Sequence, residues 1–131
     1  MTEMNSMPSL LELLPGKEYQ YDEKIMSFPT TGIVSVTNRC NLACPYCFNK
    51  QNGVDMDFET ADMTARFLLA NAAITKRKPT FNFFGGEPLL KFDDIIVPLV
   101  NKYNDAFSWG MTTNGTLLDE GIVDWLYKHH I

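Results

Sequence analysis

The alternation of hydrophobic and polar residues predicts three strands, separated and followed by helical segments. The first strand is a β-branched run at residues 33–37, Ile-Val-Ser-Val-Thr. The second strand, at residues 80–84, is rich in phenylalanine and ends at two glycines. The third strand is expected at residues 107–113. Each of these runs has strand composition and stops at residues typical of turns.

Hydrophobic residues at helical spacing predict a first helix between the first two strands. Asp55 or Asp57 is expected to cap its N-terminus. Spacings of four, three and four residues predict that one face of this helix is buried. That face consists of Met63, Phe67, Ala70 and Ile74.

Two further helices are expected after the second and third strands. The second helix begins near Asp93, and Pro98 is expected to kink it because proline lacks a backbone N–H. Its predicted buried residues are Ile95, Ile96, Leu99 and Tyr103. The third helix is capped by Asp119 and uses Ile122, Val123 and Leu126.

This order of elements predicts an α/β fold made of three successive strand-helix units. Such alternation implies right-handed crossovers and a parallel sheet, either open or curving toward a barrel. Residues 1–31 are interpreted as an N-terminal appendage and residues 32–131 as the α/β domain. In parallel α/β folds, ligands bind at the carboxyl ends of the strands.

Three strand-helix units cover the faces and edges of a parallel sheet poorly. The sequence also ends one residue after His129-His130, where such a domain would normally enter another strand. We therefore expect a truncated chain or a fragment. Self-association through the exposed sheet edges is one way to cover them.

Composition and charge narrow the expected partners and location. The net charge is −5 and no run of lysine or arginine occurs, so nucleic acid is not an expected partner. No apolar stretch approaches the roughly 20 residues that span a bilayer. The N-terminus lacks a basic segment followed by an apolar one. We expect a cytoplasmic protein without a membrane segment.

All three cysteines of the chain lie within eight positions, directly after the first predicted strand. An odd number of cysteines without a secretion signal argues against a disulfide framework. Cys40, Cys44 and Cys47 follow the pattern CxxxCxxC, which favours metal ligation. A four-iron cluster takes four terminal ligands, so three thiolates leave one iron open to a further ligand.

Two more motifs follow the second and third strands. Gly85-Gly86-Glu87-Pro88 has glycines that allow the backbone to approach a ligand closely. Thr112-Thr113-Asn114-Gly115 offers hydroxyl and amide groups. Each motif alone is also typical of an ordinary turn. Their shared position at the carboxyl ends of strands favours a joint ligand site.

The segment 40–49, CNLACPYCFN, together with GGEP and TNG, resembles the radical S-adenosylmethionine (SAM) superfamily. The resemblance covers residues 32–128 and implies part of a (β/α)6 barrel. Its motifs are most similar to those of the peptide- and protein-modifying branch, which includes sulfatase-maturing (SPASM-type) enzymes. That branch implies a peptide or protein substrate and an electron donor of the flavodoxin or ferredoxin type.

The resemblance also implies cofactors and site residues. Cys40, Cys44 and Cys47 would hold a 4Fe-4S cluster, and SAM would bind its open iron and be cleaved to a 5'-deoxyadenosyl radical. No side chain is expected to act as an acid or base. Gly85, Gly86 and Glu87 would contact the methionine amino group of SAM. Tyr46 would contact its adenine, and Asn114 would contact either SAM or the substrate.

Other interpretations of the cysteines stay open at this point. A structural zinc site would use His129 or His130 as the fourth ligand, although zinc ligands usually come in two separate pairs. A non-catalytic iron-sulfur or zinc module, or an inactive fragment, would also carry this motif.

Overall fold

The computed structural model describes residues 28–131, which form a three-stranded parallel sheet in the order β1-β2-β3. Strand β1 spans Thr31–Thr37, β2 spans Thr80–Gly85 and β3 spans Ser108–Met111. These strands confirm the predicted α/β class and the parallel arrangement. The predicted appendage lies largely in residues 1–27, outside the described residues, and Thr31 already belongs to β1. The predicted boundary at residue 31 remains a prediction.

The three strands are parallel, so their carboxyl ends lie at one edge of the sheet. Thr31 of β1 pairs with Thr80 of β2, which in turn pairs with Ser108 of β3. At the other end, Thr37 pairs with Gly85 after a register shift. The segments that follow the strands therefore start from the same edge. In the described part of the chain β1 and β3 are the outer strands, so self-association through them remains a prediction.

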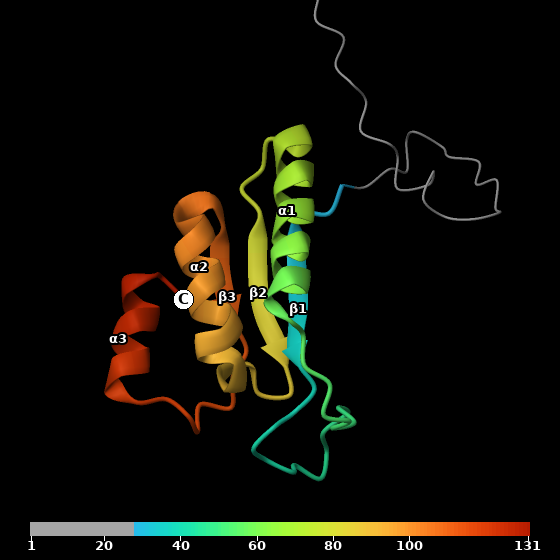
Figure 1. The fold of residues 1–131 in the computed structure, drawn as a ribbon, viewed down its shortest axis with the longest axis vertical. Helices are drawn as coiled ribbons and strands as arrows, with labels where there is room; N and C mark the ends of the chain where they lie inside the picture. The colour runs from blue at the N-terminus through green and yellow to red at the C-terminus, as the bar shows by residue number, and fades with distance from the viewer. Residues whose placement is uncertain (1–27) are drawn as a thin grey trace, which may run out of the picture.

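Helices α1 and α2 cover one face of this sheet, and α3 lies beside α2 (Figure 1). The helical segments are α1 Phe58–Thr75, η1 Pro88–Lys91, η2 Phe92–Ile96, α2 Val97–Tyr103, η3 Asn104–Ala106 and α3 Glu120–Lys128. The core lies between this face and the helices. Val36, Phe81 and Phe83 from the strands are fully buried there, together with Ile96 and Leu99 from the segment after β2.

The predicted buried face of α1 is wrong. Met63, Phe67 and Ile74 are 58%, 41% and 58% exposed. The helix instead packs through small residues and one leucine, namely Ala61, Ala65, Leu68 and Ala72. Small side chains let the helix axis lie close to the sheet, which leaves the larger hydrophobic residues on the outside.

The helix caps and the proline behave largely as expected. Asp57, and not Asp55, caps α1, because its Oδ1 accepts a hydrogen bond from the Thr60 backbone N–H at 2.7 Å. Asp119 caps α3 in the same way, as predicted. Pro98 lies in the first turn of α2, where a missing N–H is tolerated, and the preceding η2 segment is a π-helix. The expected distortion is therefore present just before Pro98.

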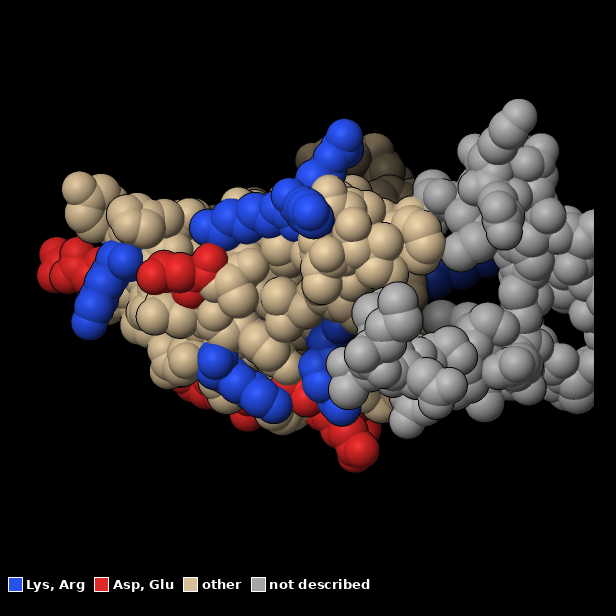
Figure 2. All heavy atoms as spheres, turned by 90° about the horizontal axis from the view of Figure 1, so that it is seen from above, with Lys and Arg blue, Asp and Glu red and all other residues tan. Residues whose placement is uncertain are grey.

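The predicted core residues of the second helical segment are mostly confirmed. Ile95, Ile96 and Leu99 are buried, while Tyr103 is only partly buried. On α3, by contrast, no residue is fully buried. None of the described helices is long and apolar enough to cross a membrane. On the face seen in Figure 2, basic and acidic side chains are scattered among uncharged ones.

Candidate cofactor site

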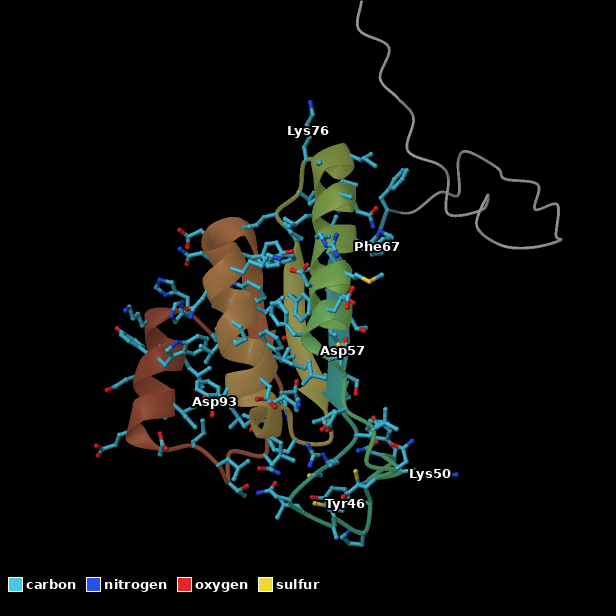
Figure 3. The ribbon with its side chains drawn as sticks, viewed as in Figure 1. Tyr46, Lys50, Asp57, Phe67, Lys76 and Asp93 are labelled. Carbon is cyan, nitrogen blue, oxygen red and sulfur yellow. The ribbon has the colours of Figure 1, made fainter. Side chains whose placement is uncertain are left out.

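The cysteines lie on a long connection between β1 and α1, here called the cysteine loop (residues 38–57). This loop extends beyond the carboxyl ends of the strands, where Tyr46 and Lys50 are seen, at the opposite end of the molecule from Lys76 (Figure 3). The Met56 backbone N–H donates to the Val36 carbonyl at 2.9 Å, and the Asn38 N–H donates to the Val54 carbonyl at 2.8 Å. Both ends of the loop are thus fixed beside the end of β1.

Asp55 strengthens this closure of the loop. Its Oδ1 accepts hydrogen bonds from the Thr37 hydroxyl at 2.6 Å and from Arg39 Nε at 2.9 Å. Arg39 Nη2 also bonds to Oδ2, and Lys91 Nζ lies 3.7 Å from that oxygen. The bond from Arg39, followed by the bond from Thr37, lowers the pKa of Asp55 to about 2. The carboxylate therefore stays charged and holds the residues just before Cys40.

The role of Asp55 was missed in the sequence, where it was considered only as a helix cap. Its partners Thr37 and Arg39 are 18 and 16 residues away, so the contact cannot be predicted from the spacing of neighbouring residues. The signal that could have found it is indirect. An acidic residue near the end of a loop and a basic residue near its start are the kind of pair that closes a loop.

The two glycines after β2 lie against the start of the cysteine loop. The Gly86 N–H donates to the Thr37 carbonyl at 2.8 Å, and the Glu87 N–H donates to the Arg39 carbonyl at 2.9 Å. A Cβ at Gly85 would lie 2.2 Å from the Thr37 carbonyl oxygen, and Gly85 has a φ of +139°. A Cβ at Gly86 would lie 2.1 Å from the Arg39 carbonyl oxygen. Glycine is required here because two backbone segments meet.

The Glu87 side chain joins the turn after β2 to the end of β3. It is completely buried, and its Oε1 accepts hydrogen bonds from the Leu89 N–H at 3.0 Å and the Thr113 hydroxyl at 2.7 Å. Its Oε2 accepts a bond from the Asn114 N–H at 2.8 Å. The carboxylate thus has a clear internal role, and a contact with SAM remains a prediction.

Asn114 completes the convergence of the three motifs. Its side-chain Nδ2 lies 3.8 Å from Cys40 Sγ and 3.0 Å from Asn41 Oδ1. The sequence predicted that the cysteine loop, the GGEP turn and the TNG turn lie at one edge. The structure brings all three together there.

The three cysteines themselves are free thiols, with Cys47 exposed and the other two partly buried. The Cys47 N–H donates to the Cys44 carbonyl at 3.1 Å, which forms a turn between these two. Among residues 28–131, no three histidine, cysteine or acidic side chains are gathered as they would be around a metal ion. The donor set nevertheless fits a cluster, because three accessible thiols lie on one short segment with fixed ends. Metal binding would gather them, as often occurs in metal sites.

Tyr46 and Phe48 flank the last cysteine. Tyr46 is 88% exposed, and its predicted contact with adenine remains a prediction. The Phe48 ring stacks against Phe84 of β2, with centroids 6.4 Å apart. This contact holds the end of the motif near the sheet.

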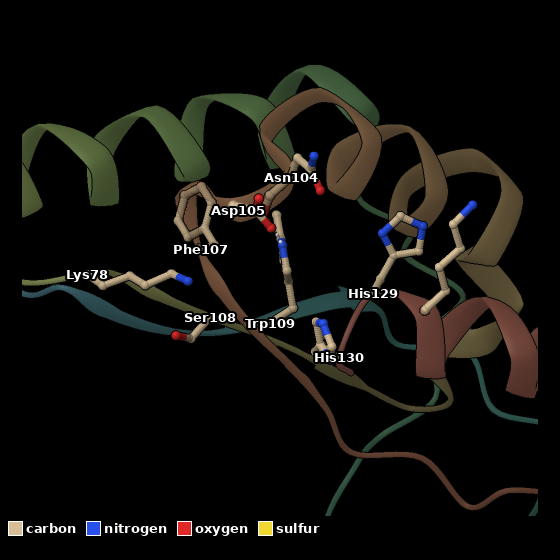
Figure 4. A pocket seen from close by; sticks show the side chains of 9 residues that line it. Lys78, Asn104, Asp105, Phe107, Ser108, Trp109, His129 and His130 are labelled. Carbon is tan, nitrogen blue, oxygen red and sulfur yellow. Dashed lines mark hydrogen bonds between the residues drawn. The ribbon is translucent and has the colours of Figure 1, made fainter.

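The two histidines lie elsewhere. They line a cavity of about 230 Å³ with Ser108 and Trp109, at the start of β3 (Figure 4). Because the strands are parallel, that place is at the opposite end of the sheet from the cysteine loop. The His129 ring also packs on Trp125, with centroids 4.3 Å apart. This arrangement gives no support to a zinc site that combines the cysteines with His129 or His130.

Comparison with known families assigns the chain. The sequence model described as the Radical SAM superfamily matches residues 34–130, which is most of the chain. The chain belongs to the radical SAM superfamily. The family resemblance seen in the motifs is thereby confirmed, and the fold agrees with part of a radical SAM barrel. This superfamily consists of enzymes that use SAM together with a 4Fe-4S cluster, which agrees with the predicted cofactors.

Individual relatives of this radical SAM chain refine the picture. It is 41% identical over 98 residues to an uncharacterised protein of Methanocaldococcus jannaschii, covering 70% of this chain and 32% of the relative. It is 34% identical over 92 residues to GTP 3',8-cyclase of Campylobacter jejuni, covering 66% and 28%. It is 40% identical over 89 residues to a probable GTP 3',8-cyclase of Methanocella arvoryzae, covering 65% and 26%.

The chain thus spans about a third or less of the length of these relatives. The two relatives with a named activity are GTP 3',8-cyclases, or probable ones, and none of the three is named as a peptide-modifying enzyme. The prediction of the peptide-modifying branch is therefore not supported. What is confirmed is the superfamily.

Proposed function

We propose that Cys40, Cys44 and Cys47 hold a 4Fe-4S cluster and that the chain takes part in the reductive cleavage of SAM. One observation carries this proposal. Hydrogen bonds connect the segments that follow all three strands: Gly86 to Thr37, Glu87 to Arg39, and Asn114 to Cys40. The cysteine motif thus lies at the ligand-binding edge of a parallel sheet, beside the glycine turn.

A 4Fe-4S cluster held by these cysteines, together with SAM, would supply the reactivity: one-electron reductive cleavage of SAM to methionine and a 5'-deoxyadenosyl radical able to remove a hydrogen atom from the substrate. The protein binds and orients the reactants and excludes water. The N–H groups of Gly86 and Glu87 already donate to Thr37 and Arg39. A ligand amino group, which needs acceptors, would therefore meet the carbonyl groups of this turn. An electron donor of the flavodoxin or ferredoxin type is the partner that this chemistry requires.

The proposed substrate is a purine nucleotide of the GTP type. Its support is the named activity of the relatives from Campylobacter and Methanocella. A peptide or protein substrate is the second candidate, because the CNLxCxYCF segment with GGEP and TNG resembles peptide-modifying enzymes.

Anaerobic reconstitution with iron and sulfide tests the cluster. We expect a brown, reducible cluster that produces 5'-deoxyadenosine from SAM when reductant is added. Cys44→Ala should lose the cluster, since two thiolates cannot hold it, whereas Lys50→Ala, in the same loop, should keep it. Wild-type iron and sulfide content in Cys44→Ala would contradict the ligand assignment. A cluster that does not cleave SAM would favour a non-catalytic module. Failure of the wild type to assemble a cluster would favour an inactive fragment.

A separate experiment tests the substrate. Deuterated GTP should increase the yield of 5'-deoxyadenosine and transfer deuterium into it, because the radical takes hydrogen from the substrate carbon. If GTP leaves the yield and the label unchanged, the nucleotide proposal is wrong. Transfer from a labelled peptide instead would support the second candidate.

A further inference from the structure

The side chain of Asn114 lies between the end of β3 and the first cysteine. Its Nδ2 is 3.8 Å from Cys40 Sγ and 3.0 Å from Asn41 Oδ1. A primary amide nitrogen carries two hydrogens, so it can donate to both atoms at once. One N–H is therefore directed at the cysteine sulfur.

The orientation of this amide is set by Thr116. The Thr116 backbone N–H donates to Asn114 Oδ1 at 3.0 Å, and the Thr116 hydroxyl donates to the same oxygen at 2.7 Å. A backbone N–H can only donate, so the amide oxygen must face Thr116. The nitrogen must then face Cys40.

Neighbouring groups hold the Asn114 residue in place. Asn41 Nδ2 donates to the Thr116 hydroxyl at 2.7 Å, which closes a ring of side chains with Asn114. The Asn114 backbone N–H donates to the buried Glu87 carboxylate. The amide is thus positioned by several bonds and directed at a thiol, while its predicted contact with SAM or substrate remains a prediction.

We infer that Asn114 is a positioning residue that donates an N–H···S hydrogen bond to the Cys40 thiolate and thereby raises the reduction potential of the cluster. The physical reason is electrostatic. Reduction adds negative charge that spreads onto the thiolates, and a donor to sulfur stabilises the reduced state more than the oxidised one. This inference rests on the proposed cluster.

A redox titration followed by electron paramagnetic resonance tests the inference in the reconstituted protein. Asn114→Ala should still assemble the cluster. Its reduction equilibrium should become about tenfold less favourable, which is about 59 mV for one electron. Asn41→Ala is the matched control, because it loosens the same ring while Asn114 keeps its bond to sulfur. Its shift should be less than a third as large.

A second pair of variants keeps the test valid if Asn114→Ala does not fold. Asn114→Asp retains the oxygen that Thr116 needs but lacks the N–H. Asn41→Asp is its charge control, because it places a similar negative charge beside Asn114. The potential of Asn114→Asp should be the lower of the two. The inference would be overturned if the two alanine variants had equal potentials, or if the two aspartate variants did. An unchanged potential in the Asn114 variants would also overturn it. If the wild-type protein assembles no cluster, the proposed function is wrong, and so is this inference. If the wild type assembles a cluster whose potential does not depend on Asn114, only this inference is wrong.

Discussion

The Glu87 carboxylate accepts a hydrogen bond from the Thr113 hydroxyl at 2.7 Å, across the carboxyl ends of β2 and β3. This contact explains why an acidic residue follows the two glycines. No cation pairs with the buried Glu87 carboxylate within residues 28–131, and three donors surround its two oxygens. A buried carboxylate is tolerated when donors satisfy it in this way.

Replacement of Glu87 should therefore destabilise the fold. Glu87→Ala leaves donors from Leu89, Thr113 and Asn114 without an acceptor, and we expect a loss of about 2–4 kcal/mol in the free energy of unfolding. Glu87→Gln keeps one oxygen and should lose about half as much. Urea denaturation followed by circular dichroism measures both. Glu120→Gln, on the exposed first turn of α3, should change stability by less than about 1 kcal/mol. Equal effects at Glu87 and Glu120 would contradict the structural role.

The glycine turn offers a second prediction. Gly86→Ala would place a Cβ 2.1 Å from the Arg39 carbonyl oxygen, so the turn must move away from the cysteine loop. We expect a loss of about 3 kcal/mol or more in the free energy of unfolding, comparable to overpacking in a core. Faster hydrogen exchange in the cysteine loop should accompany this loss. Gly121→Ala is the matched control: it meets no contact closer than 3.4 Å and lies in a helix, where alanine is favourable.

Local sequence patterns predicted the elements because each is defined by nearby residues. The β-branched run of β1 and the caps Asp57 and Asp119 act within a few residues of themselves. The buried face of α1 was mispredicted for a tertiary reason. Ala61 and Ala65 carry little hydrophobic signal, yet the close approach to the sheet selects them over Met63 and Phe67.

The candidate site was predictable as a set of motifs but not as a network. The positions of the cysteines, GGEP and TNG after successive strands indicated that they meet. The partners of Glu87 and Asn114 could not be read in this way. The Glu87 carboxylate bonds to Thr113 26 residues away, and Asn114 approaches Cys40 across 74 residues. Such contacts depend on the packed register of the sheet.

A third prediction concerns the contact between α1 and α2. The Tyr103 hydroxyl donates to Asp62 Oδ1 at 2.6 Å, and Lys102 Nζ donates to the same oxygen. Tyr103→Phe removes one of these bonds and should cost about 1 kcal/mol. Tyr127→Phe, at a residue that is 84% exposed, should have no effect. A loss in both variants, or in neither, would contradict the contact.

The same contact predicts a dependence on alkaline pH. Burial, followed by the bond to Asp62, raises the pKa of Tyr103 from 10.0 to about 12. The neutral phenol is therefore favoured in the folded state. The stability advantage of the wild type over Tyr103→Phe should be complete below pH 10 and disappear as the pH rises through about 12. Denaturation midpoints of the two proteins across this range provide the measurement.

The final prediction concerns Asp55, which closes the cysteine loop. Its pKa is lowered from 3.8 to about 2, chiefly by the hydrogen bond from Arg39 and then by that from Thr37. A carboxylate with a lowered pKa stabilises the folded state when it is charged. Its contribution should therefore be complete above about pH 4 and should be lost as the pH falls through about 2.

Asp55→Asn removes the charge and isolates this effect. The difference in denaturation midpoint between the wild type and Asp55→Asn should shrink as the pH is lowered from 5 to 2. At neutral pH, hydrogen exchange of the cysteine loop should be faster in the variant, because Thr37 and Arg39 lose their charged acceptor. Asp93→Asn changes an exposed acidic residue on η2 and serves as the control. A difference between wild type and Asp55→Asn that stays constant over this pH range would show that the Asp55 charge does not hold the loop closed.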